Sequence, residues 1–144
     1  MKRKTVFFTT ALAGILSVAA LGIGAAVDTP RTLMSPSDYS LGKRAIEAET
    51  RLALARCREA APAQRDVCKA EARGEERIKK AELGARYHGT VTAQDDVRIA
   101  RSKALYDVAR ARCSVRTGEE RVDCLRAARE DRNRSLADER LAST

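Results

Sequence analysis

Residues 57–68 (CREAAPAQRDVC) and 113–124 (CSVRTGEERVDC) decide the fold of this chain. Each segment begins and ends with a cysteine and has ten residues between the two. On a straight helix, residues eleven positions apart lie about 16 Å apart along the axis. The Cα atoms of a disulfide lie within about 7 Å of each other. If the cysteines of each segment are bonded, the chain must therefore reverse direction between them.

The residues inside both segments are ones that end one helix and begin another. Pro62 has no amide hydrogen and suits the first turn of a helix. The sequence therefore predicts a reversal before Pro62 and a second one near Gly118, where a capping-box pattern begins a helix. Further helix signals are Ser35-Pro36-Ser37-Asp38 and Thr92-Ala93-Gln94-Asp95 at starts, and His88-Gly89 at an end. Four helices are expected, over about 36–60 and 62–87, from about 93, and from about 118.

We predict the disulfides Cys57–Cys68 and Cys113–Cys124. Each would hold a hairpin near its tip and stabilise it by about 2–4 kcal/mol in an oxidising compartment. Crossed bonds between the segments stay open, because four cysteines allow three pairings. A zinc site of four thiolates also stays open, although ten intervening residues differ from zinc-knuckle spacing. A catalytic dithiol is disfavoured, because such pairs usually have two intervening residues at a helix start.

The surroundings of the second cysteine segment repeat those of the first. At a constant offset, Ala53, Ala55, Arg56, Arg65, Ala72 and Arg73 recur as Ala109, Ala111, Arg112, Arg121, Ala128 and Arg129. Such self-similarity indicates a duplicated structural unit.

Apolar and alanine residues recur at steps of three or four in each expected helix, which places them on one face. Narrow, alanine-rich stripes of this kind are typical of closely packed antiparallel helices. The four stripes are Leu41, Ala45, Ala48, Leu52 and Ala55; Val67, Ala70, Gly74, Ile78 and Ala81; Val97, Ala100, Ala104, Val108, Ala111 and Val115; and Val122, Leu125, Ala128, Leu136 and Leu141.

The N-terminal residues predict export. Three basic residues at positions 2–4 precede an uncharged run over 5–27, the order of a secretory signal, and small residues near 18–20 and 24–26 suit cleavage. An uncleaved anchor is the alternative, because the run is long enough to cross a bilayer. Either way, the rest of the chain should reach the periplasm. Removing residues 1–26 lowers the net charge from +8 to 8 − 3 = +5.

Several stretches resemble a group of uncharacterised exported proteobacterial proteins rich in Ala, Lys and Arg, sometimes labelled Tol-like cell-envelope biogenesis proteins. The stretches are residues 55–57 with 65–72, the second version around 113–124, and 96–101 with 106–109. The resemblance covers most of the chain from Tyr39 onward and implies an exported envelope protein, but no activity. Relatives tend to carry glycine in the turn, whereas this chain has Gly118 in one unit and Pro62 in the other.

The sequence contains no cluster that predicts catalysis. His88 is the only histidine and precedes a helix-ending glycine, so we expect a capping or exposed side chain. Acidic pairs at 95–96 and 119–120 stand at helix starts, where the helix dipole favours negative charge. Phosphate-loop, zinc-protease and calcium-loop patterns are absent, so we predict no cofactor, no metal site and no enzyme activity. Tyr39, Tyr87 and Tyr106 are too few to predict nucleic-acid binding.

The sequence therefore predicts an all-α protein of two duplicated, disulfide-stapled antiparallel hairpins, bundled or extended, after an apolar N-terminal segment. We expect a signal peptide or anchor at 1–26, a linker at 27–35, hairpin 1 at 36–88, a linker at 89–92 and hairpin 2 at 93–141. The expected function is a non-enzymatic periplasmic interaction or structural module of the cell envelope. The alternative is a thiol-redox or metal-handling protein that uses Cys57, Cys68, Cys113 and Cys124. Expected partners are an envelope protein or an anionic envelope polymer, with membrane contact only through an uncleaved N-terminal segment.

Overall fold

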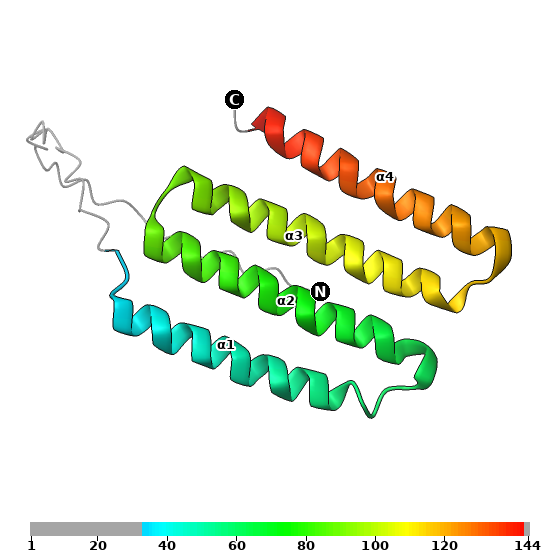
Figure 1. Ribbon diagram of the computed structural model, residues 1–144, viewed down its shortest axis with the longest axis horizontal. Coiled ribbons are helices and arrows are strands. Elements are labelled where there is room, and N and C mark those ends of the chain that lie inside the picture. Colours follow the sequence, from blue (N-terminus) through cyan, green and yellow to red (C-terminus); the bar gives the residue numbers. More distant parts are fainter. Residues whose placement is uncertain (1–32, 143–144) are drawn as a thin grey trace, which may run out of the picture. The chain divides into compact units, whose positions relative to one another are not determined.

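The computed structural model describes residues 33–142, which form four helices and no strand (Figure 1). The helices are α1 (Pro36–Arg56), α2 (Pro62–His88), α3 (Val91–Arg112) and α4 (Gly118–Ala142), with a 3₁₀ turn, η1 (Cys113–Val115), before α4. The predicted fold of two disulfide-stapled helical hairpins is confirmed. The expected signal peptide or anchor at 1–26, and most of the linker at 27–35, lie outside the described residues.

Each hairpin reverses direction between its two cysteines. The Cα atoms are 5.5 Å apart in Cys57–Cys68 and 5.7 Å apart in Cys113–Cys124. The first helix ends at Arg56, earlier than the predicted 60. The amides of residues 58 and 59 donate to carbonyls only three residues back, which tightens the last turn and brings the chain round to Pro62.

The two hairpins are joined by a shorter link than the sequence suggests. Gly89 has φ 63°, a left-handed conformation that ends α2 and suits glycine. Thr90 then caps α3, because its hydroxyl accepts a hydrogen bond of 3.2 Å from the amide of Ala93. Predicting Thr92 as the cap was therefore wrong, and α3 begins at Val91 within the expected linker 89–92.

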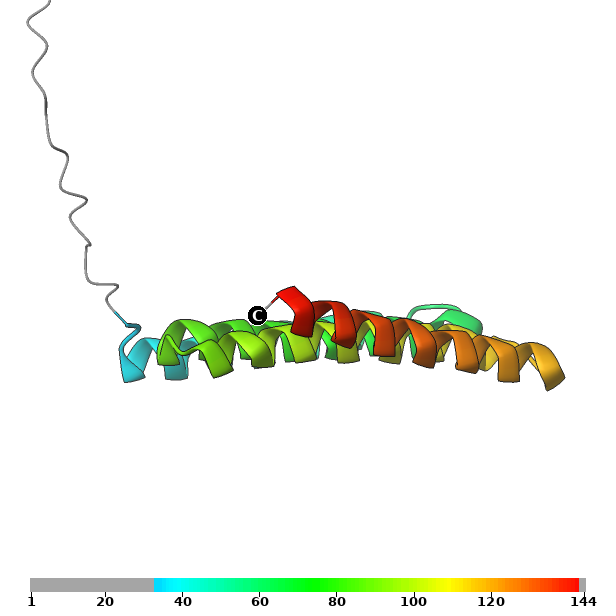
Figure 2. The ribbon, with the colours of Figure 1, turned by 90° about the horizontal axis from the view of Figure 1, so that it is seen from above.

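The helices lie side by side in one layer, in chain order. Each helix packs mainly against its neighbour in the sequence, and Figure 2 shows the layer from its edge. The two hairpins thus meet through α2 and α3 rather than closing into a bundle. Gly74 permits this contact, since an added Cβ there would lie 2.9 Å from the Cβ of Ala104.

The buried interior is thin and concentrated between α2 and α3. The stripes predicted for these helices are confirmed in their middle parts, where Gly74, Val97 and Ala104 are buried. The buried apolar residues among those described are Cys57, Leu83, Ala85, Ala93, Val97, Ala100, Ala104, Cys113 and Ala128.

The prediction that the α1 stripe packs against α2 was wrong. Leu41 is 55% exposed and Leu52 is 67% exposed. The side of α1 that meets α2 instead carries Gly42, next to Leu83, and the buried Thr50. In a single layer an edge helix has one neighbour, so only one of its two apolar sides is covered.

The ends of the predicted stripes on the second hairpin are also exposed. Val115 in η1 is 59% exposed and Val122 in α4 is 58% exposed, although Ala128 is buried as predicted. Both valines lie close to the hairpin turn, where α3 and α4 no longer cover each other.

The first hairpin is also held together at its open end. The rings of Tyr39 in α1 and Tyr87 in α2 stack with centroids 4.4 Å apart, and Lys43 lies over the Tyr39 ring. Exposed His88 packs edge-on against Tyr87 in the last turn of α2, in agreement with the predicted role at a helix end. Aromatic stacking and the disulfide therefore restrain opposite ends of one helix pair.

None of the helices within residues 33–142 has the length and apolar character needed to span a bilayer.

Candidate functional site

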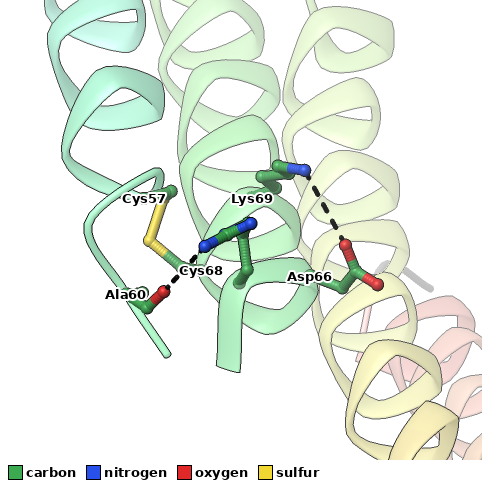
Figure 3. Close-up of a disulfide and its surroundings, with 6 residues drawn as sticks. Cys57, Ala60, Asp66, Cys68 and Lys69 are labelled. Carbon is green, nitrogen blue, oxygen red and sulfur yellow. Dashed lines mark hydrogen bonds and ion pairs between the residues drawn. A yellow bond between two sulfur atoms is a disulfide. The ribbon is translucent and has the colours of Figure 1, made fainter. Parts of the chain in front are cut away.

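The first candidate for chemistry is the pair of disulfides. Cys57 caps the C-terminus of α1 and Cys113 caps that of α3, and their exposed fractions are only 1% and 0%. In the turn of the first hairpin, Arg65 donates a hydrogen bond of 3.4 Å to the carbonyl of Ala60 (Figure 3). The four predicted cysteines are thus brought together in the predicted pairs, and the crossed pairing is not observed.

This environment does not favour thiolate chemistry. The C-terminus of a helix carries a partial negative charge, which disfavours an anionic sulfur at Cys57 or Cys113. Burial disfavours the thiolate further. Within the part of the chain that the structure describes, no three His, Cys, Asp or Glu residues are grouped as metal ligands. Each disulfide joins the two helices of its hairpin across the turn.

Two ion pairs join α1 and α2, one on either side of their contact. Lys79 binds Glu49, and Lys80 lies 3.5 Å from Glu47 and 2.7 Å from Glu76. The hydrogen bond to Glu49 raises the pKa of Lys79, and that to Glu76 raises the pKa of Lys80. Both lysines therefore stay charged throughout the physiological pH range.

The second candidate is the outer side of α1. It carries an apolar face of the kind that packs against another helix, but no described helix covers it. Because the repeat offset is 113 − 57 = 56, Leu41, Ala48, Leu52 and Ala55 correspond to Val97, Ala104, Val108 and Ala111 of α3. In α3 this face packs against α2: Val97 is 7% exposed and Ala104 is 5% exposed. On α1 no helix within residues 33–142 covers the corresponding residues. We call Leu41, Ala45, Ala48, Leu52 and Ala55 the α1 edge.

The opposite edge of the layer, on α4, is polar. The offset places Glu130 and Arg134 of α4 where α2 has Gly74 and Ile78, which face α3. Glu130 and Arg134 are both exposed. A polar outer face is what a terminal repeat needs in order to stay soluble. The outer face is therefore polar on α4, whereas the α1 edge keeps an apolar helix-packing face that no helix covers.

Two grooves open on one side of the layer. The larger, of about 730 Å³, runs over α3 between α2 and α4 and has Ile78 and Leu105 among its lining residues. The buried Ser102 also lines it, and its hydroxyl has no hydrogen-bond partner among the described residues. A smaller groove, of about 380 Å³, lies between α1 and α2 next to Lys79. Both are open hollows with mixed charge at their rims.

Sequence reasoning named the cysteines correctly and missed the α1 edge as a site. The periodicity correctly placed these residues on one face of α1, but the prediction assigned that face to the contact between α1 and α2. The repeat offset was the available signal, because it matches this face with the side of α3 that faces the other hairpin. The ring of Tyr106 lies under the guanidinium of Arg132, which is 4.6 Å from the ring centroid.

Comparisons with known proteins add no identification. No family model matches the chain, and no curated protein or solved structure is significantly similar to it. The resemblance to exported proteobacterial proteins therefore stays a prediction.

Proposed function

We propose that this protein is a non-enzymatic helical interaction module of the cell envelope, which acts in the periplasm and binds a partner protein through the α1 edge. The observation that carries the proposal is the uncovered helix-packing face on α1. The same face of α3 packs against a helix within this molecule. Export, which the N-terminal residues predict, would deliver the module to the compartment where its disulfides are stable.

The packing of α2 on α3 indicates what the partner should look like. The side of α2 that meets α3 is formed by small residues, including Gly74 and Ala85, which allow close approach. A partner helix with a similar narrow stripe of glycine and alanine would fit the α1 edge. Full burial of a leucine contributes about 1.5–3 kcal/mol. Covering the exposed parts of Leu41 and Leu52 should therefore contribute roughly 2–4 kcal/mol in total.

A thiol-redox or metal-handling role is the alternative class of function. Burial of Cys57 and Cys113 at helix C-termini supports a structural role for the sulfurs. Titration of free thiols and metal content in protein purified from the periplasm separates the two roles. Fully oxidised, metal-free protein agrees with the module, whereas labile thiols or bound zinc would favour the alternative.

The partner-binding proposal is tested by crosslinking and capture from envelope extracts. Leu41→Gln with Leu52→Gln should abolish capture of the partner, because two polar groups would be buried in the contact. Leu105→Gln with Val122→Gln is the matched control, since both residues are as exposed but lie away from α1. The control should capture as the native protein does. Equal capture by all three proteins, or no reproducible partner, would refute the proposal, and a second copy of the chain as the captured protein would identify the module as self-associating.

A further inference from the structure

The two sides of the helical layer differ in charge. The groove side carries the ion pairs Glu82–Arg101 and Glu71–Arg112, as well as the grooves themselves. On the other side, which we call the back face, lie Arg77 with Asp107 and Lys80 with Glu47. Neither of these back-face pairs lines a groove. Charged residues three or four positions along a helix from these four residues, or from one another, lie on the back face where they line neither groove.

The back face is strongly basic by this criterion. On α2, Lys69 and Arg73 precede Arg77 and Lys80 at steps of three or four. The other back-face cations are Lys43 and Arg51 on either side of Glu47 in α1, and Lys103 and Arg110 on either side of Asp107 in α3.

Most back-face acids are paired with cations, although Asp96, eleven residues before Asp107 on the same side of α3, is exposed and makes no ion pair among the described residues. Glu47, Asp66 and Asp107 bind Lys80, Lys69 and Arg77 respectively. Within the part of the chain that the structure describes, the back-face cations Lys43, Arg51, Arg73, Lys103 and Arg110 are among those that make no ion pair with an acid. All five side chains are exposed. This face therefore presents unneutralised positive charge from three neighbouring helices.

The arrangement of these cations fits a plane rather than a line. The helices form one layer, so the back faces of α1, α2 and α3 lie at similar height (Figure 2). Neighbouring helix axes are about 8–10 Å apart, and one helical turn rises about 5.4 Å. Both distances are comparable to the Debye length of about 8 Å at physiological ionic strength, so the potentials of neighbouring cations add. A linear polymer would meet one row of cations, whereas a planar anionic surface meets all rows together.

We propose that the back face binds the phosphate headgroups of a bilayer that contains anionic lipid. Ile99, which is 41% exposed and precedes Lys103 by one helical turn, would lie at the headgroup boundary. This surface is separate from the α1 edge, so a membrane-bound protein keeps that edge accessible to its partner. The proposal extends the expected membrane contact beyond the N-terminal segment.

The test measures which lysines of the full chain a membrane protects. The protein is mixed with phosphatidylcholine vesicles, with or without phosphatidylglycerol, and lysine acetylation is read by mass spectrometry. Lys43 and Lys103 should be acetylated several-fold more slowly only when phosphatidylglycerol is present, and Lys79 on the groove side should be unaffected. The acetylation rates that are compared belong to lysines of the same chain. Membrane insertion of the N-terminal run therefore does not alter the comparison between them. Protection should disappear at high salt.

Charge variants supply the matched control. Arg73→Gln, Lys103→Gln and Arg110→Gln together should weaken binding to phosphatidylglycerol vesicles roughly 100-fold at low salt, since each surface cation contributes about fivefold. Arg56→Gln, Arg86→Gln and Arg112→Gln remove the same net charge from the groove side and should leave protection of Lys43 unchanged.

Three results would overturn the inference. Uniform protection of back-face and groove-side lysines would show non-specific attraction, and no protection would show that the back face does not bind lipid. Equal protection by soluble polyphosphate at the same phosphate concentration would assign the face to a polymer instead. None of these results bears on the partner contact, which is measured with substitutions at Leu41 and Leu52.

Discussion

Replacing Gly74 with alanine should weaken the contact that joins the two hairpins. The added Cβ would lie 2.9 Å from the Cβ of Ala104, so α2 and α3 must move apart. Overpacking of this kind destabilises by about 1–3 kcal/mol. Alanine also stabilises a helix by roughly 0.5–1 kcal/mol relative to glycine. The same substitution at Gly84, where an added Cβ meets no atom within 4 Å, has only the second effect.

The difference between Gly74→Ala and Gly84→Ala therefore isolates the contact between the hairpins. Gly84→Ala should raise the free energy of unfolding by roughly 0.5–1 kcal/mol. Gly74→Ala should lie about 1–3 kcal/mol below Gly84→Ala. Urea unfolding followed by circular dichroism, with both disulfides intact, measures the two values. Equal stabilisation by the two substitutions would show that α2 and α3 do not approach closely at Gly74 and would refute the reasoning.

Three further predictions concern the staples, one buried hydroxyl and one ion pair. Replacing Cys57 and Cys68 with serine should lower the free energy of unfolding by about 2–4 kcal/mol, measured by urea titration; an unchanged midpoint would contradict a stapling role. Ser102→Ala should raise it by about 1 kcal/mol, because the hydroxyl is buried without a partner, and a lower melting temperature would show that the hydroxyl is bonded. The pKa of Lys79 is raised above its ordinary 10.5, so the contribution of its pair with Glu49 is fully present below pH 10.5 and is lost as the pH rises through the raised pKa. Above neutral pH, the melting temperature of the native protein should therefore fall towards that of Glu49→Gln only above pH 10.5, and convergence between about pH 7 and pH 10 would contradict the assignment.

Local signals in the sequence were sufficient for the hairpins. Pro62 and Gly118 mark the two reversals, and the reach of a disulfide requires a reversal between cysteines eleven positions apart. Helix ends were less well predicted where two caps compete. Thr90 and Thr92 can both begin a helix, and the left-handed Gly89 decides in favour of Thr90, since it turns the chain immediately.

The sequence predicted which residues share the face that forms the candidate site, but not that this face is uncovered. Periodicity correctly placed Leu41 and Leu52 on one face of α1, but periodicity does not say whether a neighbour covers that face. The repeat offset relates this face to Val97 and Val108 of α3. Its exposure follows only from the position of α1 at the edge of the layer.

By itself, the sequence determined the number of helices, the two turns and the duplication, and it favoured the observed pairing of the cysteines over the crossed one. These features depend on capping groups, backbone restraints and covalent reach, all of which act over a few residues. Only the tertiary structure decided that the hairpins join through α2 and α3 in one layer, leaving the α1 edge open and gathering unpaired cations on the back face. Which faces are covered depends on contacts between residues far apart in the chain, and these contacts form only when the helices pack.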